Sequence, residues 1–123
     1  MIPKCGLPEG EKMCRLGLGP GSNKVALCCS TCGLDVVESF CGHGIGRSFH
    51  EDPEVPNAGK SGSGARLANG MTLAIEPMTS ADGGGVNILR DGWTVVTKSG
   101  ALSAHFEHTV AVMPSGPVIL TEL

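Results

Sequence analysis

Residues Cys41 to Glu51 read Cys-Gly-His-Gly-Ile-Gly-Arg-Ser-Phe-His-Glu and place two histidines, His43 and His50, seven positions apart among glycines. Glycine has no side chain, so the backbone of this stretch can approach a ligand closely. Histidine is the commonest metal ligand in proteins, although a single loop histidine more often has no such role. The stretch therefore predicts a glycine-rich loop that supplies part of a metal site, whose other ligands come from elsewhere in the chain.

Two later segments each place a carboxylate within an apolar strand pattern. Residues 74 to 78 read AIEPM around Glu76, and residues 103 to 109 read SAHFEHT around Glu107. Burial of an unpaired carboxylate is costly, so such a group is expected to find a cation or bind a metal. From these residues alone, pairing with Arg or Lys, or simple exposure to solvent, is the more common explanation.

His43, Glu76 and Glu107 together form a one-nitrogen, carboxylate-rich ligand set if their strands are neighbours in one sheet. Such a set suits Mn(II), Fe(II), Co(II) or Zn(II). Alternation over residues 71 to 76 turns Glu76 away from the larger apolar side chains, and alternation over residues 103 to 113 places His105 and Glu107 on one face. Periodicity thus permits a shared site with His43 at the rim of the sheet, but does not require it.

Size and composition indicate one globular domain. The chain has 123 residues, of which 41% are hydrophobic and 17% charged, which are values typical of a packed core. The net charge is −3, and the scattered Lys and Arg form no surface suited to nucleic acid. No apolar run approaches the roughly 20 residues of a membrane span, and the N-terminus lacks a signal-peptide profile. We therefore expect a cytoplasmic protein with neither a nucleic-acid nor a membrane partner.

The cysteines are concentrated at the start of the chain, at positions Cys5, Cys14, Cys28, Cys29, Cys32 and Cys41. Nothing in the sequence indicates secretion, so reduced thiols are expected rather than disulfides. Cys29 and Cys32 form a lone CxxC, whereas a structural zinc site usually has two such pairs. A redox dithiol is not favoured either, because no βαβ pattern frames the motif.

Residues 1–34 are expected to be irregular, with one short helix from Asn23 to Thr31 that Ser22 caps and Gly33 ends. A strand from Asp35 then runs into the glycine-histidine loop, and residues 51–70 read as a polar linker. Short alternating segments separated by turn residues follow to the end of the chain. The predicted fold class is α+β, a curved antiparallel sheet with few helices, in which the later strands form a meander.

The segments GHGIG, FHE, AIEPM, DGWTVVTK and FEHT, taken in this order, resemble type I methionine aminopeptidases over about Asp35 to Thr121. The resemblance is to the C-terminal half of these metallopeptidases, whose pita-bread fold has two similar αβ halves sharing one metal site. Proline-specific peptidases of the same wider fold have a comparable histidine segment but a different final strand, which favours the methionine branch. The resemblance implies an atypical segment at 1–34 and half of a catalytic domain at 35–123.

The resemblance also implies roles for individual residues. His43, Glu76 and Glu107 match ligands of two divalent ions, Co, Mn, Fe or Zn, with Glu107 bridging them. His50 matches a histidine that contacts the scissile amide. Phe49 and Trp93 match residues that line the pocket for the methionine side chain, although single aromatic residues more often serve core packing.

The implied reaction removes the initiator methionine from the N-terminus of a nascent chain whose second residue is small. In the implied mechanism the two ions activate a bridging water that attacks the first peptide bond, and Glu76 accepts the proton. Glu76 and His50 are therefore the candidate catalytic residues.

Two of the five ligands expected from this family, both aspartates, have no counterpart here, since the acidic residues before His43 lie outside any similar strand pattern. At most one ion is therefore expected. Three hypotheses follow: an aminopeptidase completed by another polypeptide, a metal-binding but inactive fragment, or a non-enzymatic binding domain of the same fold. The surface that a second half would cover further predicts self-association.

Overall fold

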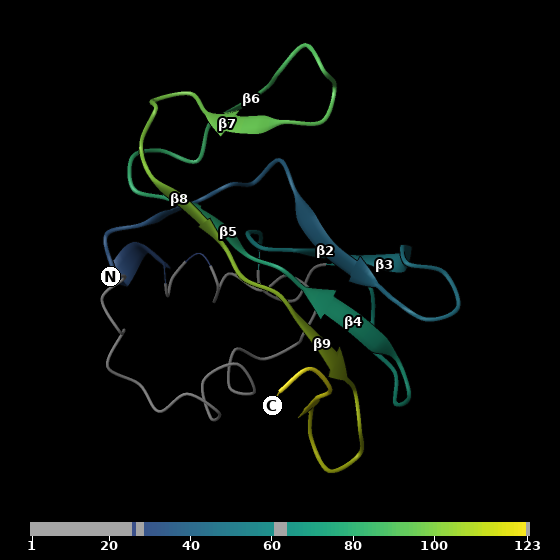
Figure 1. Ribbon diagram of the computed structural model, residues 1–123. Helices are drawn as coiled ribbons and strands as arrows, with labels where there is room; N and C mark the ends of the chain where they lie inside the picture. Colours follow the sequence, from purple (N-terminus) through teal and green to yellow (C-terminus); the bar gives the residue numbers. More distant parts are fainter. Residues whose placement is uncertain (1–25, 27–28, 61–63, 123) are drawn as a thin grey trace.

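The computed structural model describes residues 26, 29–60 and 64–122. Their architecture is that of antiparallel β-sheets (Figure 1). The strands are β1 (Asp35–Val36), β2 (Cys41–Gly44), β3 (Glu51–Pro56), β4 (Thr72–Ile75), β5 (Met78–Ser80), β6 (Val86–Ile88), β7 (Val95–Thr97), β8 (Ser103–His105), β9 (His108–Ala111) and β10 (Val118–Ile119).

The strands form three sheets. The largest has five strands in the order β10-β9-β4-β2-β3, a second has three in the order β1-β5-β8, and β6 pairs with β7 in a separate hairpin. The hairpin is inserted between β5 and β8, which pair with each other. The predicted meander is therefore wrong in its connections, because β5 and β8, which flank the hairpin in the sequence, pair with each other and not with β6 or β7.

Two neighbouring chain segments pass together from the five-stranded sheet into the three-stranded sheet. One leaves β4, passes Glu76 and Pro77, and continues as β5, while the other runs from β8 through Phe106 and Glu107 into β9. Pro77 has no N–H for the ladder, but its carbonyl accepts a hydrogen bond of 3.3 Å from the Phe106 N–H. The predicted single strand over 103 to 113 is thus two strands, β8 and β9. The predicted curved antiparallel sheet is confirmed.

The core lies on one face of the five-stranded sheet. Leu73, Ile75 and Val110 are buried there, with Leu73 directly opposite Val110 on the neighbouring strand. Partly buried apolar side chains pack against them, namely Val55, Leu67, Val112 and Ile119. The alternation over residues 71 to 75 predicted this apolar face, and its opposite face is the one available to Glu76.

The start of the glycine-histidine stretch, Cys41–Gly44, is strand β2 and not part of the predicted loop, whereas residues 45–50 do form a loop that leads into β3. β2 lies between β3 and β4 in the strand order, so His43 is not on an edge strand of the sheet. A Cβ atom at Gly42 would lie 2.2 Å from the Ala74 carbonyl oxygen, and one at Gly44 would lie 2.1 Å from that of Asp52. The glycines therefore permit close approach of neighbouring strands, whereas the sequence alone indicated close approach of a ligand.

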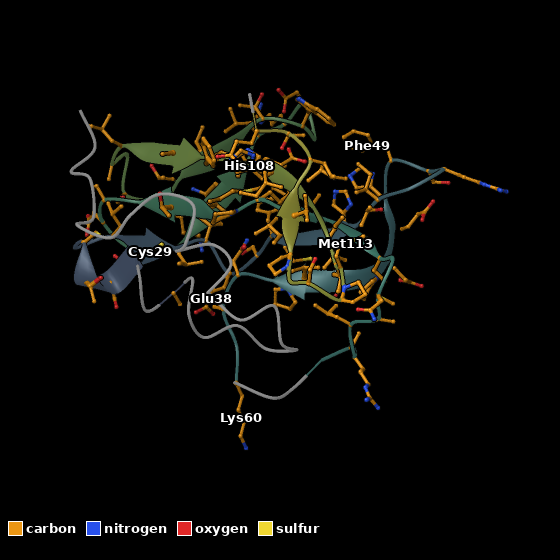
Figure 2. The ribbon with its side chains drawn as sticks, turned by 90° about the horizontal axis from the view of Figure 1, so that it is seen from below. Cys29, Glu38, Phe49, Lys60, His108 and Met113 are labelled. Atoms are coloured by element: carbon orange, nitrogen blue, oxygen red, sulfur yellow. The ribbon has the colours of Figure 1, made fainter. Side chains whose placement is uncertain are left out.

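The predicted polar linker over 51–70 is also wrong in its first part, because Glu51 to Pro56 forms β3. β3 is an edge strand that pairs only with β2. Prolines and exposed charges are tolerated at an edge because the outer side of the strand needs no ladder partner. Beyond β3 the chain leaves the sheet, and Lys60 projects away from it (Figure 2).

Most of the helix predicted from Asn23 to Thr31 lies outside the described residues, as do Cys5, Cys14 and Cys28. Its end is described: Gly33 has φ +70°, and the N–H of Leu34 donates to the carbonyl of Cys29 at 3.0 Å. This is the Schellman arrangement that a glycine after a helix permits. Within the described residues, no helix combines the length and apolar character needed to cross a bilayer.

Candidate metal centre

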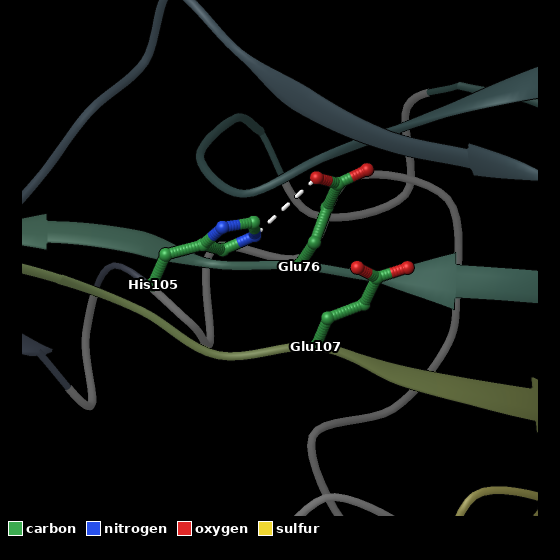
Figure 3. A group of neighbouring side chains, drawn as sticks. All are labelled: Glu76, His105 and Glu107. Carbon is green, nitrogen blue, oxygen red and sulfur yellow. Dashed lines mark ion pairs between the residues drawn. The ribbon is translucent and has the colours of Figure 1, made fainter. Parts of the chain in front are cut away.

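Glu76 and Glu107 lie directly opposite each other at the passage between the two larger sheets. The same register continues from the five-stranded sheet into the three-stranded sheet, because Ile75 lies opposite His108 and Met78 lies opposite His105. Glu76 therefore lies directly opposite Glu107. Figure 3 shows both carboxylates directed to the same side of the strands, which confirms that the two acidic side chains share a face.

Glu76 lies between two imidazoles. Its Oε1 atom is 3.2 Å from Nε2 of His43, and its Oε2 atom is 3.4 Å from Nε2 of His105. The Glu76 side chain is only 14% exposed, and in the described part of the chain no Lys or Arg forms an ion pair with it. Ordinary pairing with a basic side chain, the more common explanation from sequence, therefore does not account for this carboxylate.

The His43 ring is held in a defined orientation. Its Nδ1 atom lies 2.8 Å from the carbonyl oxygen of Gly44. Since a carbonyl only accepts, this contact is a hydrogen bond in the tautomer that carries its proton on Nδ1, which leaves Nε2 available to bind a metal ion. Metal-binding histidines commonly fix their free nitrogen in this way with a neighbouring carbonyl.

Glu76, His105 and Glu107 each offer a ligand atom, and these atoms all lie within 4.8 Å of one another. Among the described residues this is the one group of three or more His, Cys, Asp or Glu side chains suited to a metal ion. It contains both predicted carboxylates, whereas His43 contacts Glu76 from the other carboxylate oxygen. His105 was not selected from the sequence, although the alternation that selected Glu107 places His105 on the same face.

The aromatic residues predicted to contact substrate fall into two places. The His50 ring lies 4.3 Å from the His43 ring, and Phe49 meets His50 edge-on with ring centres 4.8 Å apart. Both therefore lie beside the candidate ligands. Trp93 lies in the turn between β6 and β7 and is 88% exposed, and no ring contact among the described residues joins it to Phe49 or His50.

Asn57 and Cys41 are two further residues near Glu76. The buried side chain of Asn57 donates to the backbone carbonyls of Phe40 and Glu76, each at 3.4 Å, and so ties the end of β4 to the start of β2. Burial raises the pKa of the Cys41 thiol, and the charges of Glu54 and Glu76 raise it further. The Cys41 thiol of the metal-free chain therefore stays protonated at neutral pH, and Cys41 lies outside the ligand group.

The donor set fits one divalent ion. Two carboxylates supply two negative charges, imidazoles supply nitrogen donors, and this mixture of oxygen and nitrogen is typical of sites for Mn(II), Fe(II), Co(II) or Zn(II). His105 and Glu107 are exposed, the former with 47% of its side chain accessible. An ion held here would keep open positions for water or a substrate.

Comparison with known proteins identifies the family to which this chain belongs. Residues 13–114 match the model of metallopeptidase family M24, and the chain belongs to this family. The match begins well before Asp35, where the recognisable motifs start. Its similarity to individual members points to one branch: it is 56% identical over 100 residues to the methionine aminopeptidase of Clostridium perfringens and 50% identical over 90 residues to methionine aminopeptidase 1 of Bacillus subtilis.

Solved structures agree with this relationship. The methionine aminopeptidase of Thermotoga maritima superposes with a TM-score of 0.80 at 42% identity, covering 87% of this chain and 45% of that one. The enzyme from Rickettsia prowazekii gives 0.78 at 34% identity, covering 90% and 48%. The described strands therefore form a fragment of the pita-bread fold, which confirms the predicted fold class.

The chain spans less than half the length of the curated relatives it matches. The alignment covers 81% of this chain but 40% of the Clostridium perfringens protein, and 73% of this chain but 36% of the Bacillus subtilis protein. Family membership is thus established for the chain, while the activity of the longer proteins has to be argued separately.

Proposed function

We propose that this chain carries part of the active site of a metal-dependent methionine aminopeptidase, which removes the initiator methionine from the N-terminus of nascent proteins. The observation that supports this most directly is the position of Glu76, opposite Glu107 and 3.2 Å from Nε2 of His43. These are the three residues whose motifs resemble the family's metal ligands. The substrate partner would be a peptide N-terminus, and the compartment the cytoplasm.

His43, Glu76 and Glu107 would hold a divalent ion. When bound, such an ion polarises the carbonyl of the first peptide bond and acidifies a water at the site. Glu76 would accept the proton released from that water, since its carboxylate is the most enclosed of the anionic groups and is held by imidazoles on both oxygens. A general base needs this proximity to the proton it removes.

Substrate contacts would come from the loop after β2. His50, whose ring lies 4.3 Å from that of His43, is close enough to the ion site to contact the scissile amide. Phe49 is 68% exposed and Trp93 88% exposed, so both offer apolar surface to a ligand rather than to the core. An apolar wall favours the thioether of methionine over polar side chains.

A second candidate function is metal binding without catalysis. It is favoured by the single ligand group found among the described residues, because the two-ion mechanism needs a second metal to stabilise attacking and leaving oxygens. In this second case the chain binds a metal ion at the same site but does not hydrolyse peptides.

Metal titration and peptide hydrolysis, carried out on the same purified 123-residue chain, test both candidates. Calorimetry with Mn(II) or Co(II) should give about one site per chain, and release of methionine from a Met-Ala peptide should be far slower than the roughly 1 to 1000 per second typical of enzymes. His43→Ala serves as the control for contaminating peptidase. Slow release that His43→Ala abolishes supports the aminopeptidase, metal binding without release supports the second candidate, and no metal binding contradicts both.

A further inference from the structure

His105 occupies a position from which it can act on the same ion as the two carboxylates. It is the last residue of β8, directly opposite Met78 on β5. Since Glu76 lies two positions before Met78, Glu76 and His105 are diagonal neighbours across the strand pair, within reach of long side chains. Figure 3 shows the His105 ring directed toward Glu76, next to Glu107.

We infer that His105 is an additional metal ligand in this chain, so that one ion is bound by Glu76, His105 and Glu107 together. This inference rests on the metal site of the proposed function and adds a ligand that the family motifs do not supply. It also assigns a role to a residue that the sequence motifs leave without one.

The spacing of the donor atoms supports coordination. A charge-assisted hydrogen bond between nitrogen and a carboxylate oxygen usually measures about 2.7–2.9 Å, whereas Nε2 of His105 lies 3.4 Å from Oε2 of Glu76. Two ligands each about 2.1 Å from one tetrahedral ion lie about 3.4 Å apart. The observed separation is therefore compatible with two ligand atoms arranged around a common ion.

The charge of the group supports the same conclusion. Glu76 and Glu107 face each other with no Lys or Arg paired to either among the described residues, and like charges directly opposite in a sheet are destabilising. A neutral imidazole cannot cancel two negative charges, but a divalent ion can, and the His105 imidazole is then a ligand in addition to His43, Glu76 and Glu107. A second nitrogen near the ion shifts preference toward Zn(II) or Co(II) and away from Mn(II), which prefers oxygen.

The test compares His105→Gln with the parent chain. The glutamine amide can still donate a hydrogen bond to Glu76 but has no imidazole lone pair, so it separates ligation from positioning. Calorimetry with Zn(II) should show a loss of affinity greater than roughly 100-fold, since loss of an outer-shell partner costs roughly 10- to 100-fold. Addition of Zn(II) should also shift the ¹⁵N resonance of Nε2 in His105.

His108→Gln is the matched control. His108 lies one residue beyond Glu107 but on the other face, opposite Ile75 and bonded to the Thr121 hydroxyl at 2.8 Å. Its replacement should leave Zn(II) affinity within about twofold, well inside the range of a residue that does not touch the ion.

Failure of this inference can be told apart from failure of the proposed function. If His105→Gln loses less than about tenfold in affinity and the Nε2 resonance of His105 in the parent chain does not respond to Zn(II), while Glu107→Gln loses binding, His105 is not a ligand and the proposed metal site stands. If the parent chain binds neither Zn(II) nor Mn(II), both ideas are wrong.

Discussion

Glu76 and Glu107 lie opposite each other on adjacent strands, at the point where both strands leave one sheet and enter the next. Two carboxylates in this relationship repel one another unless a cation lies between them. The arrangement is therefore unfavourable for a purely structural element and appropriate for a metal site.

Replacement of Glu107 by alanine should abolish binding of Mn(II) or Co(II), because it removes one of the two anionic ligands. The same change should raise the free energy of unfolding of the metal-free chain by about 0.2–1 kcal/mol, since it relieves the repulsion with Glu76. Calorimetric titration and thermal melting in the presence of a chelator measure the two effects. Glu38→Gln, at an exposed position outside the ligand group, should change neither, and retained metal binding by Glu107→Ala would refute the assignment.

Gly44→Ala should destabilise the chain by about 1–3 kcal/mol, as overpacking of a tight contact does. The added Cβ would lie 2.1 Å from the Asp52 carbonyl oxygen, so β2 and β3 would have to separate beside His43. Urea unfolding measures the change. At Gly85 the nearest atom to an added Cβ is the flexible Lys98 side chain at 3.2 Å, so Gly85→Ala should change stability by no more than about 0.5 kcal/mol. Equal effects of the two substitutions would show that strand approach is not the constraint.

The turn that carries Trp93 should loosen in acid. The hydroxyl of Thr94, followed by the backbone N–H groups of Trp93 and Thr94, lowers the pKa of Asp91 below its ordinary value of 3.8. A lowered folded pKa means that the charged carboxylate stabilises the turn above that ordinary value, and that this contribution is lost as the pH falls through the folded pKa. Fluorescence of Trp93, the one tryptophan, should therefore change below about pH 3.8.

Asp91→Asn provides the control for this acid transition. The Oδ1 atom of asparagine can still accept the two backbone hydrogen bonds from Trp93 and Thr94, although its amide nitrogen cannot accept from the Thr94 hydroxyl, and the side chain does not titrate in this range. The fluorescence change should disappear in this variant. A transition that persists unchanged would have to come from another carboxyl group.

The chain should self-associate at high concentration. Large apolar side chains are exposed, among them Leu102 at 85% and Phe106 at 62%, and extended apolar surface promotes association. Sedimentation velocity should show a concentration-dependent increase in mass that Leu102→Ser weakens and that Arg90→Ser, at another exposed position, does not. A monomer at every concentration would contradict this expectation.

Local sequence patterns predicted the residues that share a face, because alternation is a property of a single strand. Leu73 and Ile75 on the core side, and Glu76 and Glu107 on the other, follow from period two alone. The same pattern continues through Pro77 and Phe106, so it could not reveal that each segment there changes sheets. That break depends on pairing between segments about thirty residues apart, which periodicity does not encode.

Other features depended on neighbours that the sequence does not identify. Gly42 and Gly44 looked like loop residues because glycine is favoured in turns, and only the flanking strands show that they relieve a clash. Asn57 looked like part of a polar linker, although its buried amide binds the Glu76 carbonyl. His105 had the right periodicity, but nothing in the sequence indicated which residue it would meet across the strand.

The position of β3 also limits how copies of this chain can join. Pro53 and Pro56 cannot donate hydrogen bonds from the backbone, and exposed acidic side chains accompany them on this edge of the five-stranded sheet. An approaching extended segment would find an interrupted row of donors and a negative charge, which are the features that discourage strand addition and fibre growth. Copies that meet through the exposed apolar side chains would therefore pack against each other's surfaces, while the β3 edge resists extension of the sheet from one molecule to the next.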